Sequence, residues 1–358
     1  MEDVAYPLDV YAREAYMQPL WEGGIVCQES VMPLEEPDGS LKDIPLLYSA
    51  SEIVSVRSSD LRTEYTQGVD YALTNGKLRI LDGAIPRVAW AKLYPPEAFE
   101  APPGSLIFPG KTVPWIWVEG GLQFHSWQLS VTYKHTDPWT DSIPSRQGNR
   151  LPGTLAKLEA GKPLRLLVYG DSITVGAQSS GWCDAAPYAP AWYDLFADTL
   201  RARYGSEITL INTAVSGTAS AWGAGNAKTL AADQKPDLAV IAFGMNDGSG
   251  SVPIARYIGN ILKIMAAVRA ANPQCEFILI ATSLPNPKST FATGMHEAYR
   301  PRLLRLGQKG VAVADLTRLH QDLLARKRFE DFSGNNINHP NDFLARVYAQ
   351  ALIETMQK

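Results

Sequence analysis

The sequence predicts an α/β protein in two parts: an all-β, jelly-roll-like sandwich at residues 1–135, then a three-layer α/β/α domain with a parallel sheet at residues 163–358. Three observations lead to this prediction. Up to about residue 135, short strand-like segments follow one another without a long helical stretch. From residue 163 onward, short apolar runs alternate with amphipathic stretches, the order typical of a parallel sheet covered by helices. Residues 136–162 are rich in proline turns and are predicted to be a linker.

The composition is that of a soluble globular protein with a sizeable core: 358 residues, 46% hydrophobic and 20% charged. The formal net charge of -4 gives no sign of the basic surface that nucleic-acid binding needs. No apolar run is long enough to span a membrane. We therefore expect neither a nucleic-acid nor a membrane partner, and the sequence does not indicate the oligomeric state.

The cysteines and the first residues bear on the cellular compartment. Cys27, Cys183 and Cys275 are widely spaced and predict neither a disulfide framework nor a zinc site. No H-E-x-x-H motif is present, so we expect no metal and no cofactor. The acidic start of the chain lacks the basic and apolar regions of a signal peptide. We expect a cytoplasmic protein, although a secreted protein whose leader had been removed would begin in the same way.

The first part contains eight strand-like segments. The dipeptide Asn75-Gly76 between two of them is a strong hairpin signal. Trp115, Trp117 and Trp127 are interpreted as core residues rather than a sugar-stacking surface, although the alternation that puts Trp115 and Trp117 on one face fits both. The expected strands are residues 25–31, 44–48, 52–58, 71–73, 77–81, 87–91, 114–118 and 122–133.

The second part contains five apolar runs and six helical stretches, after one short amphipathic turn at residues 154–160. Pro301 is expected to kink or divide its helix. The expected strands are residues 164–169, 208–212, 238–243, 277–281 and 311–315. The expected helices are residues 190–203, 224–233, 253–271, 293–307, 316–327 and 341–356.

Chemically useful residues follow three of these strands and precede the last helix. Ser172 follows the first strand, Gly217 the second and Asn246 the third, while His339 lies just before the final helix. The carboxyl ends of parallel strands meet at one edge of a sheet, so we expect these residues to lie together. A serine in this place, taken alone, is more often a helix cap than a nucleophile. Together the four supply a nucleophile, oxyanion donors and a general base for acyl transfer.

These four segments resemble the four blocks of the SGNH hydrolases, also called the GDSL lipase/esterase family. They read Gly-Asp-Ser-Ile, Ser-Gly-Thr, Gly-Met-Asn-Asp and Asn-His-Pro-Asn-Asp, in the family's order, and the resemblance covers residues 163–358. It implies that Ser172 is the nucleophile and His339 the general base. It also implies an oxyanion hole made of the Ser172 and Gly217 N–H groups and the Asn246 side chain. Asp171 and Asp247 are expected to be structural.

The sequence departs from the family at the third catalytic position. The family usually has an aspartate three residues before the histidine, and here that residue is Asn336. We expect a working dyad in which Asn336, or a backbone carbonyl of residues 335–338, orients His339. In the alternative arrangement Asp331 or Asp342 supplies the missing carboxylate. Asp342 is instead expected to cap the last helix, which favours the dyad.

The resemblance implies a serine esterase that removes short acyl groups, in particular acetyl, from a small-molecule or oligosaccharide ester. A β-sandwich before an SGNH domain is similar to the arrangement in some carbohydrate esterases. Two alternatives stay open: a carbohydrate-binding protein whose hydrolase domain is inactive, and an acyltransferase that uses the same serine and histidine. The nucleophile elbow of α/β-hydrolases is excluded because Thr174 replaces the last glycine of G-x-S-x-G. Residues 223–229 only superficially resemble a phosphate loop, because Ala227 stands where glycine is needed.

Overall fold

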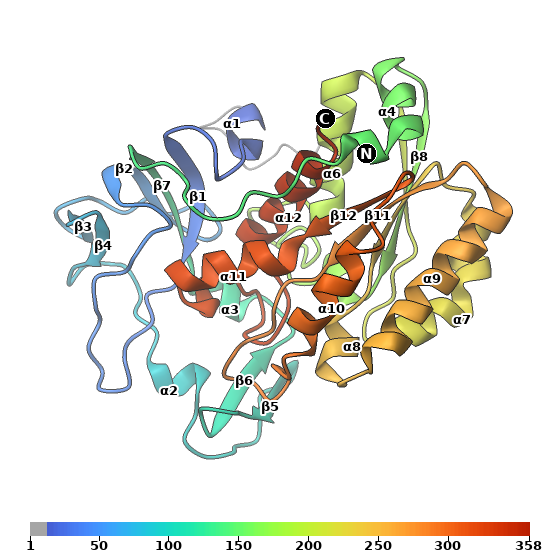
Figure 1. Ribbon diagram of the computed structural model, residues 1–358. Helices are drawn as coiled ribbons and strands as arrows, with labels where there is room; N and C mark the ends of the chain where they lie inside the picture. The colour runs from blue at the N-terminus through green and yellow to red at the C-terminus, as the bar shows by residue number, and fades with distance from the viewer. Residues whose placement is uncertain (1–12) are drawn as a thin grey trace.

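The computed structural model describes residues 13–358, so the predictions on residues 1–12 lie outside the described residues. Its second part is built on one five-stranded parallel sheet with the order β12-β11-β10-β8-β9 (Figure 1). This is the doubly wound order: the second strand of the sheet lies on one side of the first strand, and the three later strands lie on the other side. The α/β fold class predicted from the sequence is confirmed. The strands are β8 (Leu164–Gly170), β9 (Ile208–Asn212), β10 (Leu238–Ala242), β11 (Glu276–Ala281) and β12 (Val311–Asp315).

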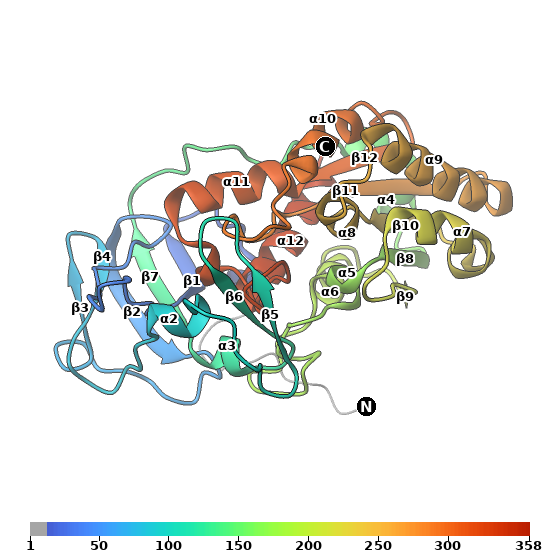
Figure 2. The ribbon, with the colours of Figure 1, turned by 90° about the horizontal axis from the view of Figure 1, so that it is seen from below.

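Helices cover both faces of the sheet (Figures 1 and 2). Neighbouring side chains along β8 enter different cores: Leu166 and Val168 pack with α6 (Trp192–Tyr204), α11 (Leu316–Arg326) and α12 (Asp342–Thr355). Leu167 and Tyr169 pack against the other layer. This is why the strand sequence is apolar without a break. The other layer is formed by α7 (Ser220–Leu230), α9 (Ile254–Ala271) and α10 (Met295–Leu304).

The helices differ from the predicted ones in two ways: two additional short helices follow strands, and the helix that contains Pro301 is not divided. Short helices α5 (Ser172–Val175) and α8 (Met245–Ser249) begin almost directly after β8 and β10, two neighbouring inner strands of the sheet. These helices were not predicted from the sequence, because single helical turns carry no amphipathic period. Pro301 lies inside α10 and does not divide it.

The first part contains antiparallel sheets. A three-stranded sheet has the order β1 (Ile25–Val31), β7 (Leu129–His135), β2 (Ala50–Ser58), and it follows α1 (Arg13–Met17). The predicted hairpin is present as β3 (Tyr71–Thr74) and β4 (Lys77–Ile80), with φ of 50° at Asn75 and 75° at Gly76. A second hairpin joins β5 (Ser105–Pro109), which was not predicted, to β6 (Trp115–Glu119). These sheets are smaller than those of a full jelly roll, because each hairpin remains two-stranded.

Three predicted strands of this part are wrong. Residues 122–133 are not one strand, because Gln123–Ser126 form helix α3 before β7 begins. Glu119 Oε2 accepts a hydrogen bond from the N–H of Phe124 at 3.0 Å, which satisfies a donor of the first helical turn. In residues 87–91 the chain enters helix α2 (Trp90–Leu93), and residues 44–48 contribute only an isolated bridge between Ile44 and Leu78.

The segment predicted as a linker lies against the sheet. It contains a 3₁₀ turn, η1 (Gly148–Arg150), and the expected amphipathic turn, which forms α4 (Pro152–Glu159). The Gln147 side chain donates to Val313 O at 2.7 Å and accepts from Val313 N at 3.1 Å. These bonds occupy backbone groups of β12, an edge strand of the sheet. The domain boundaries themselves stay a prediction.

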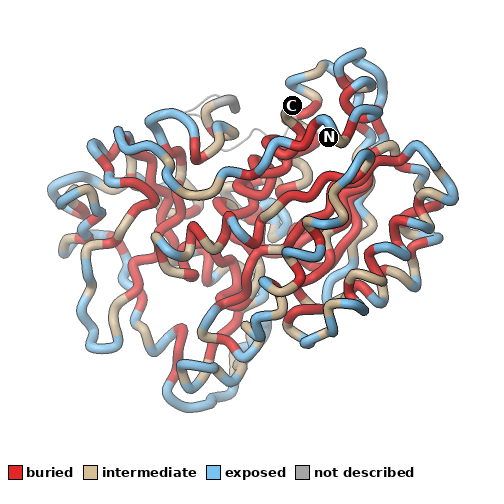
Figure 3. Tube along the Cα trace, in the orientation of Figure 1, coloured by how far each residue is buried: buried red, intermediate tan, exposed pale blue. Residues whose placement is uncertain are grey.

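One apolar core runs from the first part into the second (Figure 3). It joins Val31, Val56 and Leu129 of the antiparallel sheet to Val347 and Leu352 of α12. The shared core favours an N-terminal part that is integral to the protein rather than a detachable module.

None of the helices within residues 13–358 is long and apolar enough to cross a membrane.

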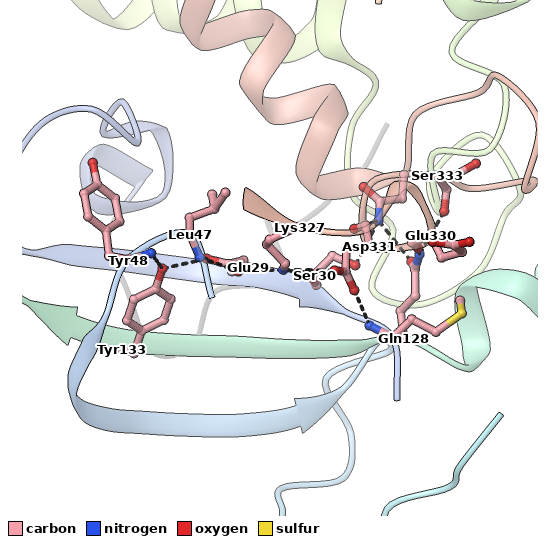
Figure 4. Close-up of polar contacts among 12 residues, drawn as sticks. Glu29, Ser30, Leu47, Tyr48, Gln128, Tyr133, Lys327, Glu330, Asp331 and Ser333 are labelled. Carbon is pink, nitrogen blue, oxygen red and sulfur yellow. Dashed lines mark hydrogen bonds and ion pairs between the residues drawn. The ribbon is translucent and has the colours of Figure 1, made fainter. Parts of the chain in front are cut away.

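A buried ion pair crosses the same interface (Figure 4). Lys327 Nζ donates to Glu29 Oε1 at 2.6 Å and to Ser30 O at 2.7 Å, and neither charged side chain is exposed. The second carboxylate oxygen of Glu29 accepts from Tyr133 Oη at 2.6 Å. A buried carboxylate needs such partners because it has lost its hydration.

Lys327→Met is expected to lower the free energy of unfolding by about 3–5 kcal/mol, because it leaves the Glu29 carboxylate buried without its cation. Urea denaturation measures this change. Lys134→Met is the matched control: it breaks an exposed lysine–glutamate pair with Glu52 at 2.9 Å and is expected to cost less than about 1 kcal/mol. Equal losses in the two variants would contradict a role for the buried pair.

Candidate active site

Ser172 lies at the carboxyl end of β8, between the ends of β9 and β10. β8 and β10 approach closely here, since a Cβ on Gly170 would lie 2.4 Å from Ala242 O. Ser172 begins helix α5, and Asp171 caps this helix by accepting from Ile173 N at 3.1 Å. The hydroxyl is therefore held on a short, capped turn at the switch point of the sheet, where open α/β sheets bind ligands.

His339 is bonded directly to this serine. Its Nε2 lies 2.8 Å from Ser172 Oγ, although the two residues are 167 positions apart. The loop before α12 is folded around Asn335, whose Oδ1 accepts the N–H groups of Ile337, Asn338 and His339, each at 3.0 Å. The structure thus brings together the predicted nucleophile and the predicted base, and a tight Asx-type turn fixes the ring in place.

Burial sets the charge of the histidine. It lowers the pKa of His339 to about 4, because the cationic ring would lose its hydration. At neutral pH the ring is uncharged, so one ring nitrogen carries a proton and the other has a free lone pair. A neutral imidazole is the form that can accept a proton from a serine.

The other ring nitrogen of His339 contacts Gln178, which the sequence analysis missed. His339 Nδ1 lies 3.0 Å from Gln178 Oε1. Gln178 Nε2 donates to two backbone carbonyls of the first part, Gly120 O at 2.8 Å and Gly121 O at 2.9 Å. The only sequence signal was its position six residues after the serine, and glutamine is not the residue type that the family pattern points to.

Asn336 is not placed as expected. Its side chain lies in a separate buried network, accepting from Tyr94 Oη and Asn286 Nδ2, both at 3.1 Å, and donating to Trp117 O at 3.0 Å. Its backbone is left-handed, with φ of 67°. With both ends of the amide occupied, Asn336 anchors the loop to the first part of the chain and does not orient His339.

The two aspartates considered as alternatives also have other partners. Asp331 Oδ1 accepts from Met32 N at 2.7 Å, and Asp342 Oδ1 accepts from Ser180 N at 2.8 Å. The cap of α12 is Asn341, which accepts from Leu344 N at 3.0 Å, and Asp342 is the first helical residue. The expected cap is therefore wrong by one position, since asparagine serves this role equally well.

The two remaining predicted site residues follow the neighbouring strands. Asn246 Nδ2 donates to Thr218 O at 2.8 Å, which ties the segment after β10 to the Gly217 segment after β9. An amide nitrogen has two hydrogens, so one remains for a ligand. Gly217 is exposed and has a left-handed backbone, with φ of 76°, a conformation that glycine adopts freely.

Two buried aspartates support these segments, as the sequence analysis expected. Asp247 accepts from Ser220 Oγ at 2.5 Å and from Ser220 N at 2.9 Å. Burial raises the pKa of Asp247, and burial together with the nearby Asp247 charge raises the pKa of Asp171 to about 7. The Asp171 carboxyl accepts from Ile173 N in α5, and the Asp247 carboxyl accepts from the first residue of α7.

The comparisons with known proteins identify the class. The model of the GDSL-like Lipase/Acylhydrolase family matches residues 168–346, half of the chain. The chain belongs to this family, and the predicted recognition is confirmed. Among curated proteins, an arylesterase of Vibrio mimicus is 27% identical over 139 residues, which are 39% of this chain and 64% of the arylesterase. The chain therefore spans less than two thirds of that relative's length.

Two solved structures are similar to part of this chain. A two-domain esterase active on acetylated mannans has a TM-score of 0.46 and 18% identity, over 59% of this chain and 54% of that one. Axe2, an acetylxylan esterase from Geobacillus stearothermophilus, has a TM-score of 0.46 and 16% identity, over 55% of this chain and 96% of that one.

Proposed function

We propose that this protein is a serine esterase in which Ser172 is the nucleophile and His339 the general base. The observation that carries the proposal is the 2.8 Å contact between Ser172 Oγ and His339 Nε2 at the carboxyl edge of the sheet. Oγ attacks the ester carbonyl while Nε2 takes its proton. The same proton then passes to the leaving alcohol, and an acyl-serine remains.

Water completes the cycle. Nε2 takes a proton from a water molecule, whose oxygen attacks the acyl-serine. The same proton then passes to Ser172 Oγ as the C–O bond breaks, which releases the carboxylic acid and restores the serine and the neutral histidine. In both steps the carbonyl oxygen becomes negative. In our proposal the N–H groups of Ser172 and Gly217 and the second amide hydrogen of Asn246 receive this charge, because donors fixed in advance stabilise it more than water does.

We propose short acyl groups, in particular acetyl, on a carbohydrate as the substrate class. Support comes from the segment that begins at Ala177, whose N–H donates to Ser172 O at 3.1 Å. This segment carries two exposed aromatic side chains, Trp182 at 48% and Tyr188 at 43%. Flat aromatic rings that stay in contact with water are suited to stack on sugar rings.

A panel of esters tests the proposal. Hydrolysis of p-nitrophenyl acetate should be at least about tenfold more efficient in kcat/KM than hydrolysis of the octanoate, a difference of about 1.4 kcal/mol in activation free energy. Acetate release from acetylated manno- or xylo-oligosaccharides tests the sugar. Absence of any hydrolysis would favour an inactive binding protein. Acetyl transfer to an added sugar in preference to water would favour an acyltransferase.

The pH profile of the esterase is expected to extend unusually far into acid. Because only the neutral ring of His339 accepts the serine proton, and its pKa lies at about 4, kcat/KM for p-nitrophenyl acetate should stay level from pH 8 to about pH 5 and fall below it. A histidine with an ordinary pKa of about 6.5 would give a decline beginning near neutrality. A midpoint near pH 6.5, measured by titrating released acid, would contradict the lowered pKa of His339.

A further inference from the structure

We propose that the turn Gly120–Gly121 of the N-terminal part fixes the proton on the catalytic histidine through the side-chain amide of Gln178. The inference rests on the proposed function of Ser172 and His339. In this inference Gln178 is a positioning residue. The hydrogen-bonded chain from the two glycine carbonyls through Gln178 and His339 to the Ser172 hydroxyl contains no charged group. It also means that two backbone atoms outside the hydrolase domain complete the active centre.

The chemistry of the four groups determines which way the amide points. Backbone carbonyls only accept hydrogen bonds, so the end of Gln178 that faces Gly120 O and Gly121 O has to be the NH₂ group. The amide oxygen then faces His339 Nδ1. Because an oxygen acceptor needs a donor, Nδ1 carries the proton and Nε2 keeps its lone pair toward Ser172 Oγ.

The stem of Gln178 is confined as tightly as its amide. The side chain is 3% exposed, and its backbone has φ of 69°, a region that residues other than glycine rarely occupy. A Cβ on Gly334, in the loop that carries His339, would lie 2.5 Å from Gln178 Cβ. Strained residues of this kind persist where the surroundings impose them, and they are concentrated at functional sites.

The turn itself is held against the hydrolase domain. It follows β6, and the β5–β6 hairpin lies beside the loop that precedes α10 (Figures 1 and 2). Lys111 N donates to Lys288 O at 2.6 Å, and an antiparallel bridge joins Gly110 to Ser289. The two carbonyls are thus presented from a fixed position.

The two carbonyl oxygens of Gly120 and Gly121 favour an amide over a carboxylate at position 178. Gln178 Nε2 lies 2.8 and 2.9 Å from the two carbonyl oxygens. A glutamate at position 178 would replace this donor with an anionic oxygen that faces both of them. The repulsion would have to be relieved by a bound proton or by movement of the side chain. The usual triad carboxylate therefore does not fit here, although it would stabilise the imidazolium by its charge.

Gln178→Met and Gln178→Glu test the proposal, with Gln123→Glu at an exposed position of α3 as the matched control. ¹⁵N NMR of the ring nitrogens of His339 in the ligand-free protein reports the tautomer without any turnover. The wild-type protein should show a protonated Nδ1, and Gln178→Met a mixture of tautomers with kcat lowered by about 10²-fold. Gln178→Glu should be at least about tenfold slower than wild type at pH 8, and Gln123→Glu unchanged.

A Gln178→Glu enzyme as active as wild type, or more active, would overturn the inference, as would a single unchanged tautomer in Gln178→Met. Failure of the proposed function looks different: turnover would survive loss of Ser172, whatever the tautomer. Gly334→Ala supplies a second route to the same answer, because it displaces the Gln178 stem while leaving the amide chemistry intact. It should reproduce the tautomer mixture of Gln178→Met, and an unchanged tautomer would count against the inference.

Discussion

Ser172→Ala is expected to lower kcat by about 10⁴–10⁶-fold and to abolish covalent labelling by a fluorophosphonate. The physical reason is that the Ser172 hydroxyl is the group that faces the proton-accepting nitrogen of the base: His339 Nε2 lies 2.8 Å from Ser172 Oγ. Without this hydroxyl no acyl-enzyme forms, and only the rate enhancement of the oxyanion donors and substrate binding remains. Mass spectrometry of labelled peptides and the release of p-nitrophenol measure the two effects.

Ser206→Ala is the control for this experiment. Ser206 is also buried, and its Oγ donates to Leu158 O at 3.2 Å, just before β9 begins and so at the opposite edge of the sheet. This variant should keep both labelling and turnover. Labelling of a residue other than Ser172, or turnover that survives Ser172→Ala with the fold intact by circular dichroism, would remove Ser172 as the nucleophile.

Asn246→Ala is expected to lower kcat by about 10²–10³-fold with a smaller change in KM. The side chain gives one hydrogen to Thr218 O at 2.8 Å, and this bond aims the other hydrogen. A donor directed at the position of the developing oxyanion stabilises the transition state more than the ester, so its loss appears mainly in kcat. Steady-state kinetics with p-nitrophenyl acetate separate the two constants.

Asn272→Ala controls for the loss of an amide. Asn272 is also half-buried and donates to Pro236 O at 2.7 Å, but it lies before β11, at the amino edge of the sheet. Its removal should leave kcat unchanged. If Asn246→Ala instead raises KM at constant kcat, Asn246 binds the ester in its ground state and the oxyanion assignment is wrong.

The parts of the site that follow strands were predictable from the sequence. A strand buried on both faces reads as an unbroken apolar run, and the polar residues just after it mark the active edge. The strand ends that carry Ser172, Gly217 and Asn246 were predicted in this way, and the short segment around His339 carried a recognisable pattern. The antiparallel part was predicted less well. Helix α3 forms where the alternation favoured a strand, because Glu119 accepts a hydrogen bond from the Phe124 N–H in the first helical turn. This contact depends on β6, whose last residue is Glu119.

Gln178 could not be predicted, because its role depends on two backbone carbonyl oxygens that lie 57 and 58 residues earlier in the chain. Backbone carbonyls leave no signature in a sequence. The same limit explains the error at Asn336. Its spacing from His339 matched the family pattern, but the positive φ and the partners Tyr94 and Asn286 direct its amide elsewhere.

Helix α12 imposes an order on biosynthesis. This helix leaves the ribosome long after β1, on which it packs: Asn341 Nδ2 donates to Ser30 Oγ at 2.9 Å, and Arg346 donates to Cys27 O. Domains usually fold one after another during translation, the N-terminal one first. Here the antiparallel sheet has to wait, with its apolar face uncovered, for more than two hundred residues to be added. Folding of the N-terminal part is thereby a late event, completed only after α12 has been synthesised. Chaperones that bind apolar strands have the whole of that interval in which to act.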